Sequence, residues 1–363
     1  MQTLTVSLPG REYDILIESG LIARAGEHCR RILPKARRCL VVTDENVGPL
    51  YLNKVLNSLE AANLTVRFVV LPAGEGTKCL SMLGRLYDEL TALGVTRTDF
   101  VLALGGGVIG DLAGFAAATI LRGIALVQIP TTLLAQVDSS VGGKVAIDLP
   151  AGKNLAGAFW QPSLVLIDPK CLDTLPDREF AAGMAEVIKY GCIRDRMLFD
   201  FLAEHAGRTA LTEHLPVVIR TCCAIKAAVV LEDERDTGVR RLLNYGHTLG
   251  HAVELAGNFE KYVHGEAVAV GMCMANRIGE ALGITPKDAG EKLISLLQSF
   301  DLPTFAPCPF DTMAAAVRLD KKNTEKETSL ILLDSIGSAR AVPMATDRLL
   351  ELAAPLCEGS PSV

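Results

Sequence analysis

Short apolar runs rich in β-branched residues alternate with segments of helical period over the first half of the chain. The apolar runs predict buried strands at 39–44, 66–72, 99–106, 125–130 and 163–168. Between these runs, residues 47–63 and 80–94 carry apolar side chains every three or four positions, as amphipathic helices do. Because strands and helices alternate, we expect a parallel sheet that helices cover on both faces.

The pattern changes near residue 170, and helical periodicity then dominates. The predicted helical segments are 178–193, 216–234, 243–257, 266–283 and 289–300, and residues 330–344 favour a late hairpin. We therefore predict an α/β plus α fold. It has a Rossmann-like parallel-sheet domain over residues 1–169 and a mainly helical domain over residues 170–363.

Composition restricts the class of protein. The 363 residues are long enough for two domains, and 49% hydrophobic with 21% charged residues is typical of a globular protein. The formal net charge is -6 and no run of lysine or arginine occurs, so no nucleic-acid or membrane partner is expected. The first residues lack the apolar centre of a secretory signal, and the most apolar stretch is interrupted by polar residues. We expect a cytoplasmic protein with reduced thiols and no membrane span.

A glycine-rich turn follows the predicted strand at 99–106. Three glycines, 105–107, lead directly into a helix that contains Gly110 and Asp111. Glycines let the backbone approach a ligand closely, and a helix N-terminus offers free N–H groups to a diphosphate. Asp44 and Asn46 follow another strand, where they could bind a ribose or the nicotinamide side. Tight strand-helix packing and a plain Asx turn explain the same two patterns without a ligand.

Histidines gather in one part of the predicted helical domain. Only six occur in the chain, and His247, His251 and His264 lie close together in sequence. The first two are four positions apart and share a helix face, and Glu254 follows about one turn later. Histidine with carboxylate suits a catalytic divalent ion, and Glu186, an acid on an apolar helix face, is a candidate to complete the site. A satisfied core histidine remains the alternative for any one of them.

Several cations and small polar residues accompany otherwise apolar segments. They are Lys144, Lys153, Asn154, Lys189, Lys226, Arg240, Lys321 and Lys322. A solvated surface position explains any one of them singly. Together, in an acidic chain, they indicate a local cationic pocket for a small, multiply anionic substrate.

Taken in order, these motifs resemble the 3-dehydroquinate synthase family along nearly the whole chain. The matching runs are 72–78, 103–118, 122–123, 128–144, 152–162, 171–191, 240–254, 264–272 and 319–322. The glycine turn, the histidine cluster and all of these cations except Lys226 fall within them. The resemblance therefore covers each of the candidate sites.

The resemblance implies a role for individual residues. It implies one divalent metal ion, zinc or cobalt, on Glu186, His247 and His264. It implies NAD on Asp44, Asn46, Glu75, Lys78, Gly106, Gly107, Val108, Asp111, Thr131, Thr132, Lys153, Cys171 and Thr174. The implied substrate contacts are Arg122, Lys144, Asn154, Lys226, Arg240, Asn244 and Lys322, and the implied catalytic residues are His251, Asp236, Asp138 and Lys189. Arg122 is expected to reach the neighbouring subunit of a homodimer.

The family's reaction converts 3-deoxy-D-arabino-heptulosonate 7-phosphate into 3-dehydroquinate and phosphate. The resemblance implies transient oxidation by NAD, phosphate elimination, return of the hydride and an intramolecular aldol closure. Two positions depart from the family pattern, because Asp236 stands where glutamate is usual and Lys326 where glycine is expected. Both departures concern the lid over the substrate.

Three rival functions share part of this pattern. Another sugar phosphate cyclase would keep the metal and NAD residues, but not the carboxylate pocket for which Lys226 and Arg240 are present. A metal-dependent polyol dehydrogenase would need no phosphate pocket. A non-catalytic relative would have no reason to keep three metal ligands with the cations.

Overall fold

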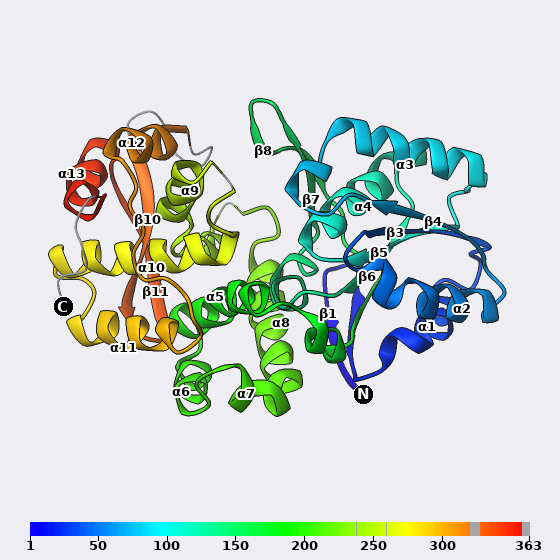
Figure 1. Cartoon of the computed structure of the whole chain (residues 1–363), viewed down its shortest axis with the longest axis horizontal. Helices are drawn as coiled ribbons and strands as arrows, with labels where there is room; N and C mark the ends of the chain where they lie inside the picture. Colours follow the sequence, from blue (N-terminus) through cyan, green and yellow to red (C-terminus); the bar gives the residue numbers. More distant parts are fainter. Residues whose placement is uncertain (237, 259, 320–326, 358–363) are drawn as a thin grey trace. The chain divides into compact units, whose positions relative to one another are not determined.

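The computed structural model describes residues 1–236, 238–258, 260–319 and 327–357. The chain forms two compact units. Unit 1 comprises Met1–Leu175 and Cys222–Leu231, and unit 2 comprises Pro176–Thr221 and Glu232–Val363. Unit 1 contains a mostly parallel sheet and unit 2 is mainly helical, so the predicted fold class is confirmed (Figure 1).

Unit 1 is built on a seven-stranded sheet. Its strands are β1 (Gln2–Val6), β2 (Tyr13–Ile17), β3 (Arg38–Asp44), β4 (Thr65–Leu71), β5 (Phe100–Gly105), β6 (Ala125–Pro130) and β9 (Leu164–Ile167). Their order is β1-β2-β9-β6-β5-β3-β4, and every neighbouring pair is parallel except β1 with β2. A separate hairpin joins β7 (Lys144–Leu149) to β8 (Gly152–Phe159).

Helices cover both faces of this sheet. They are α1 (Ala25–Ile32), α2 (Asn53–Ala61), α3 (Leu80–Leu93) and α4 (Gly107–Thr119), with shorter helical turns η1 (Leu21–Arg24), η2 (Gly48–Leu52), η3 (Glu75–Thr77), η4 (Ile120–Arg122), η5 (Ala135–Ser139) and η6 (Pro169–Thr174). Val41 of β3 packs into a core with α1 and α2, whereas its neighbours Leu40 and Val42 pack into a second core with α3 and α4. Side chains that alternate along the strand therefore fill two apolar layers.

The five strands expected at 39–44, 66–72, 99–106, 125–130 and 163–168 are confirmed to within one or two residues as β3, β4, β5, β6 and β9. The hairpins β1–β2 and β7–β8 were not anticipated. Most of β8 is half-buried or exposed, and glycine and alanine supply several of its positions. It therefore lacks the apolar alternation by which a half-buried strand is recognised.

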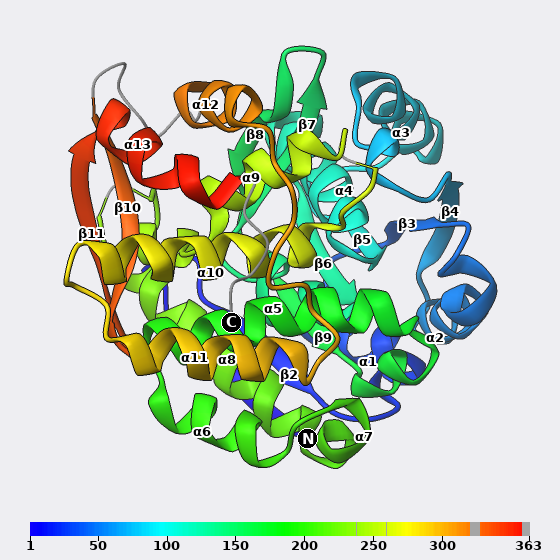
Figure 2. The same cartoon turned by 60° about the vertical axis from the view of Figure 1, so that its left-hand side comes forward.

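Unit 2 is mainly helical. Its elements are α5 (Asp177–Ile193), α6 (Arg196–Glu204), α7 (Arg208–Leu211), η7 (Thr212–His214), η8 (Val239–Asn244), α9 (His247–Ala256), α10 (His264–Ala281), α11 (Lys287–Gln298), α12 (Phe310–Leu319), the hairpin β10 (Glu327–Ser335) and β11 (Ser338–Ala345), and α13 (Thr346–Cys357). The late hairpin predicted at 330–344 is confirmed. Helix α10 packs against α5, α9, α11 and β10, and Figure 2 shows it running alongside α5 and α11.

Helix α8 (Leu215–Glu232) contributes residues to both units. The helical stretch Arg208–Glu232 is long and apolar enough to cross a membrane by length and composition alone. However, Val218, Ile219 and Val230 are buried within the protein. Val217 and Leu231 of the same helix are exposed, so the helix is buried along only part of its surface.

Candidate functional site

A buried carboxylate and two histidines meet in unit 2. Glu186 lies in the middle of α5, where its side chain is 1% exposed. His247 is the first residue of α9, and His264 is the first residue of α10. The Oε1 atom of Glu186 lies 3.5 Å from Nε2 of His247 and 3.6 Å from Nε2 of His264. One ligand atom from each of the three residues lies within 4.8 Å of the others.

These separations fit a single metal ion. Two ligands about 2.1 Å from a tetrahedral ion are about 3.4 Å apart, which is close to the observed distances. Two imidazoles and one carboxylate suit zinc or a similar divalent ion and leave coordination positions for other ligands. A buried carboxylate also requires a positive partner, because an isolated charge away from water is costly. The three residues therefore form a candidate metal centre.

The second nitrogen of each histidine is also engaged. Nδ1 of His247 lies 3.2 Å from the carbonyl oxygen of Tyr245, and Nδ1 of His264 lies 3.3 Å from Oε1 of the buried Glu254. Such partners fix which ring nitrogen faces a metal. Burial lowers the pKa of His264, but hydrogen bonds to Glu186 and Glu254 outweigh it and raise the pKa to about 10. The two carboxylates thus favour positive charge at this position, as a divalent cation would supply.

Glycines allow the three helices to approach closely enough to form this centre. A Cβ atom on Gly265 would lie 2.0 Å from the carbonyl oxygen of Ala182 in α5, and one on Gly271 would lie 2.0 Å from that of Gly246. Gly265 follows His264 directly, and Gly246 directly precedes His247. The close crossings at these glycines therefore bring the ligands at the helix starts together.

His251 and Lys189 lie beside the three ligands. The ring of His251 is 5.8 Å from that of His247 and 6.4 Å from that of His264, centroid to centroid. The ammonium of Lys189, one turn after Glu186, forms an ion pair with Oε2 of that residue and is 2% exposed. Within the described residues, the group able to hold a metal contains Glu186, His247 and His264 but neither His251 nor Glu254.

Another buried cation lies in η8, which packs against α5. Arg240 is 1% exposed, and its Nη1 donates to the carbonyl oxygen of Glu234 at 2.5 Å. Asn244 ends the same helical turn. Asp236, in the loop before it, has a φ of 62°, a left-handed conformation that aspartate tolerates better than most residues. Lys322 and Lys326 lie outside the described residues.

In unit 1, most of the residues expected to bind NAD follow the carboxyl ends of parallel strands, whereas Lys153 lies in β8 of the separate hairpin. Asp44 ends β3, Gly106 follows β5, and Thr131 and Thr132 follow β6. Cys171 and Thr174 belong to η6, after β9. Consecutive strands β4 and β5 lie on opposite sides of β3, so the order reverses there. Ligands of open α/β sheets bind at such a switch point.

The glycine turn after β5 packs closely against the loop after β6, at the carboxyl edge of the sheet. Gly106 precedes α4, and a Cβ atom there would lie 3.1 Å from Cγ2 of Thr132. Gly107 and Val108 form the first turn of α4, whose N–H groups point out of the helix start. Asp44 accepts hydrogen bonds from the backbone N–H groups of Asn46 and Val47, so the Asx turn considered from the sequence is present.

Charged residues form ion pairs near the same edge of the sheet. Nζ of Lys78 lies 2.8 Å from Oδ2 of Asp111 and 3.5 Å from Oε1 of Glu75, and Nζ of Lys153 lies 4.0 Å from the same Glu75 atom. Burial raises the pKa of Asp111, although the charge of Lys78 opposes this effect. Six elements or loops thus contribute residues that are expected to bind NAD, namely β3, η3, α4, the loop after β6, β8 and η6.

The remaining substrate candidates of unit 1 lie near its hairpin and in α8. Nζ of Lys226 contacts both Oδ1 of Asp138, at 3.0 Å, and the carbonyl oxygen of Asp138, at 2.6 Å. Lys144 begins β7, and Asn154 of β8 has a φ of 54°. Arg122 ends η4 with a φ of 67°.

Two side chains of these sites escaped prediction in their observed roles. The hydroxyl of Tyr51 contacts Oγ1 of Thr174 at 2.5 Å and the carbonyl oxygen of Cys171 at 3.3 Å, so it supports η6. Nothing local in the sequence identifies this distant contact. Glu254 was considered as a metal ligand, whereas the structure places it behind His264. Its helical spacing from His251 did reveal that it belongs to this region.

The fold is shared with several enzymes of known structure, some of which were solved with NAD⁺ and a metal ion bound. A probable glycerol dehydrogenase from Sinorhizobium meliloti, 17% identical, matches with a TM-score of 0.63 and shows the fold alone. Two sugar phosphate cyclases match much better. A 2-deoxy-scyllo-inosose synthase, solved with carbaglucose-6-phosphate, NAD⁺ and Co²⁺, is 27% identical with a TM-score of 0.87, over 97% of this chain and 99% of that one. The 2-epi-5-epi-valiolone synthase ValA from Streptomyces hygroscopicus, solved with NAD⁺ and Zn²⁺, is 29% identical with a TM-score of 0.86, over 96% and 97%. Over nearly its whole length the chain is thus similar to solved sugar phosphate cyclases.

Sequence comparison gives the particular family. Residues 68–182 match the 3-dehydroquinate synthase N-terminal model, and residues 183–323 match the 3-dehydroquinate synthase C-terminal model. The 3-dehydroquinate synthase of Clostridium beijerinckii is 46% identical over 340 residues, 93% of this chain and 97% of that one. That of Geobacter metallireducens is 48% identical over 340 residues, 93% and 94%. The chain belongs to the 3-dehydroquinate synthase family.

Proposed function

We propose that this chain converts 3-deoxy-D-arabino-heptulosonate 7-phosphate into 3-dehydroquinate and phosphate, as a lyase that uses NAD and one divalent metal ion. The observation that carries this proposal is the group formed by Glu186, His247 and His264 in unit 2. Full-length relatives at 46–48% identity carry the name of this activity. The activity places the chain in the shikimate route to aromatic compounds.

Residues 1–169 act as the NAD-binding domain and residues 170–363 as the metal- and substrate-binding domain. The switch point between β3 and β5 supports the first assignment, since it lies where the Gly106 turn begins. The backbone N–H groups at the start of α4 would hold the diphosphate, and Lys78, which pairs with Asp111 and Glu75, would supply a positive charge there. When bound, zinc or cobalt supplies a Lewis acid that lowers the pKa of a coordinated substrate hydroxyl.

The chain's own residues bind the substrate and move its protons. Arg240 binds the substrate carboxylate, since a guanidinium can donate two parallel hydrogen bonds to a carboxylate. The other substrate contacts are Arg122, Lys144, Asn154, Lys226, Asn244 and Lys322. His251 binds the leaving phosphate and transfers a proton, and its place beside the ligand histidines supports that role. Lys189, Asp138 and Asp236 complete the proton-transfer set.

The family's reaction gives these groups their order of action. When bound, NAD⁺ would accept a hydride from carbon 5, and the resulting ketone would acidify the hydrogen on carbon 6. Loss of that proton expels phosphate from carbon 7, and nearby cations stabilise the developing negative charge. The hydride would then return to carbon 5, the ring would open, and an intramolecular aldol step would close the carbocycle. The cofactor is therefore regenerated in each turnover.

An assay of phosphate release tests this function against that of other sugar phosphate cyclases. Heptulosonate phosphate should release phosphate only when NAD⁺ and a divalent metal are both present. Glucose 6-phosphate, which has no carboxylate, should release little, because it cannot make the bidentate contact proposed for Arg240. Faster phosphate release from glucose 6-phosphate would contradict the assignment.

The enzyme acts as a cytoplasmic homodimer, with Arg122 reaching the neighbouring subunit. The left-handed backbone at Leu121 and Arg122 supports this role, since strained conformations are kept where function needs them. Sedimentation of the purified protein should give twice the chain mass. A monomer that retains full activity would contradict the dimer and the role of Arg122 together.

A further inference from the structure

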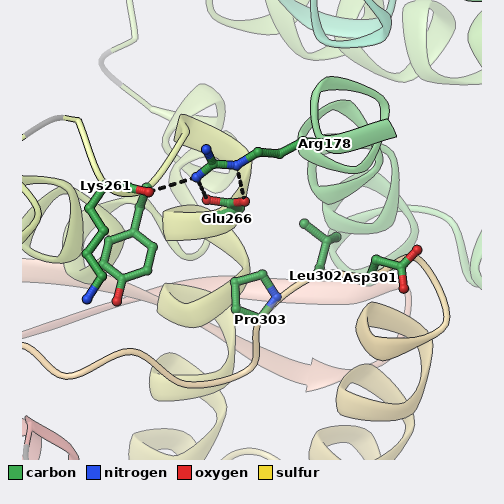
Figure 3. A pocket seen from close by; sticks show the side chains of 7 residues that line it. Arg178, Lys261, Glu266, Asp301, Leu302 and Pro303 are labelled. Atoms are coloured by element: carbon green, nitrogen blue, oxygen red, sulfur yellow. Dashed lines mark hydrogen bonds and ion pairs between the residues drawn. The ribbon is translucent and has the colours of Figure 1, made fainter. Parts of the chain in front are cut away.

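An ion pair joins the beginnings of α5 and α10, the helices that carry Glu186 and His264. Nε of Arg178 donates to Oε1 of Glu266, and Nη2 donates to Oε2, both at 2.7 Å (Figure 3). The same Nη2 donates to the carbonyl oxygen of Lys261 at 2.7 Å. One guanidinium thus holds a helix and the loop before it.

The contacts of Arg178 lie on both sides of His264, one of the proposed metal ligands, in the sequence. Lys261 precedes His264 by three positions, and Glu266 follows it by two. Oε2 of Glu266 also accepts the N–H of Val263 at 3.1 Å, so the carboxylate closes the first turn of α10. Arg178 therefore fixes the backbone on both sides of His264, although it lies about 12 Å along α5 from Glu186.

Packing alone does not fix this part of the helix. Gly265 lets α10 approach α5 at Ala182, which sets how near the two helices lie. On the side of Arg178, by contrast, a pocket of about 400 Å³ opens between the ion pair and Leu302 and Pro303. With open space there, the direction of the helix start depends on the polar contacts of Arg178.

The geometry also separates this pair from an ordinary surface pair. Isolated surface ion pairs contribute little to stability, but bidentate geometry is an exception. The side chain of Glu266 is 15% exposed, whereas that of Arg178 is 53% exposed. This arrangement predicts that the ion pair adds little to the overall stability of the protein. It also predicts that the pair strongly restrains the direction of the first turn of α10.

We propose that Arg178 and Glu266 are positioning residues, which hold His264 in the direction that the metal requires. The inference rests on the proposed metal centre. Neither residue is one of the three proposed ligands. Their effect should therefore appear in metal affinity and in the coordination geometry, before any effect on the chemical step.

Cobalt binding to the metal-stripped full-length protein tests this inference. Co²⁺ affinity is measured by competition with a chromophoric chelator, and the visible Co²⁺ bands report the coordination geometry. Arg178→Gln should weaken affinity roughly tenfold and change the bands, since changes in outer-shell partners cost about 10–100-fold. Arg178→Lys should not restore binding, because an ammonium cannot make the fork.

A second ion pair at the same end of α5 provides the control. Nη1 of Arg208 contacts Oδ1 of Asp177 at 2.5 Å. Asp177 directly precedes Arg178 in α5, but neither member of this pair belongs to α10. Arg208→Gln should leave Co²⁺ affinity and spectrum unchanged. Urea unfolding of both metal-stripped variants checks that their stabilities are comparable, and Glu266→Gln serves as a second variant if Arg178→Gln does not fold.

Three results bear on the proposal. Weak, spectrally altered binding by Arg178→Gln with normal binding by Arg208→Gln supports it. Binding by Arg178→Gln and Glu266→Gln within twofold of the unaltered protein overturns it, as does an equal loss in Arg208→Gln. Glu186→Ala distinguishes failure of the proposed metal centre from failure of the proposed role of Arg178. Undiminished Co²⁺ binding by Glu186→Ala would overturn the metal centre itself. Loss of Co²⁺ binding by Glu186→Ala would support the metal centre and leave only the role of Arg178 to be decided.

Discussion

In unit 1 most candidate NAD residues follow the ends of parallel strands. In unit 2 two of the three candidate metal ligands, His247 and His264, begin helices that cross at glycines, and the third, Glu186, lies in the middle of α5. A strand end is fixed by backbone hydrogen bonds to its neighbours, as where the N–H of Thr131 donates to the carbonyl oxygen of Gly105 at 3.0 Å. A helix start has no such ladder, and its position depends on how closely the helices pack. The position of Gly265 against Ala182 leaves no room for a methyl group.

This difference teaches where each unit should be sensitive. The nucleotide edge is assembled from several strands and loops, so one altered side chain removes one contact among many. The metal centre has three ligands, and each defines a large part of it. Substitutions of similar chemistry should therefore have larger effects in unit 2 than in unit 1.

Removal of the carboxylate ligand should have the largest effect. Glu186→Ala should weaken metal binding by more than about 100-fold, beyond the range found for outer-shell partners. Metal analysis after dialysis measures this loss. Asp111→Asn in unit 1 is the matched control and should retain the metal. Full metal occupancy in Glu186→Ala would show that other residues hold the ion.

The next largest difference between the two units should come from exchanging arginine and lysine at candidate ligand-binding positions. Arg240→Lys should lower kcat/KM by about 10–100-fold, since a charge-assisted hydrogen bond is worth about 1.5–3 kcal/mol. The reverse exchange in unit 1, Lys153→Arg, should cost much less, because that side chain is 33% exposed and 4.0 Å from its partner. Equal losses in steady-state kinetics would contradict the assigned role of Arg240.

Two glycine substitutions test the close helix crossing. Gly265→Ala should lower the free energy of unfolding by about 1–3 kcal/mol, because the added methyl group meets the backbone of α5. Gly84→Ala in α3 meets nothing within 4 Å and should stabilise the protein by about 0.4–1 kcal/mol. Urea unfolding compares the two variants. Wild-type stability in Gly265→Ala would show that α10 can shift without cost.

The smallest expected effect concerns the pH dependence of stability in unit 1. Burial lowers the pKa of His28 in α1, and the charge of Arg31 acts in the same direction. The unfolded chain therefore binds more protons than the folded protein below about pH 6.5, so stability falls as the pH falls through that range. His28→Gln should flatten this slope in urea titrations between pH 7 and 5. An unchanged slope would assign the dependence to other groups.

The sequence predicted the sheet better than the metal geometry, and for a physical reason. The apolar run ending at Asp44 and the run ending at Gly105 each carry their own strand signal, and parallel pairing then brings their ends to one edge. Periodicity also located α5 and α9. It could not predict the hairpin β7–β8, because glycine and exposed positions obscure the alternation in β8.

The histidine cluster illustrates the limit more sharply. Spacing favours His247 and His251 as partners on one face of α9, and it says nothing about His264, which begins another helix. Only the crossing at Gly265 and the burial of Glu186 show which nitrogen atoms converge. Family resemblance supplied this choice of ligands in advance; local pattern did not.

The central claim is that a hydride leaves the substrate and returns within one turnover. With heptulosonate phosphate in large excess over NAD⁺, the account predicts one phosphate released per substrate consumed. Absorbance from NADH should stay at or below the level of enzyme-bound cofactor, because the hydride returns before the closed, water-poor site opens. NADH that accumulates in step with substrate consumption, with no phosphate released, would contradict the account.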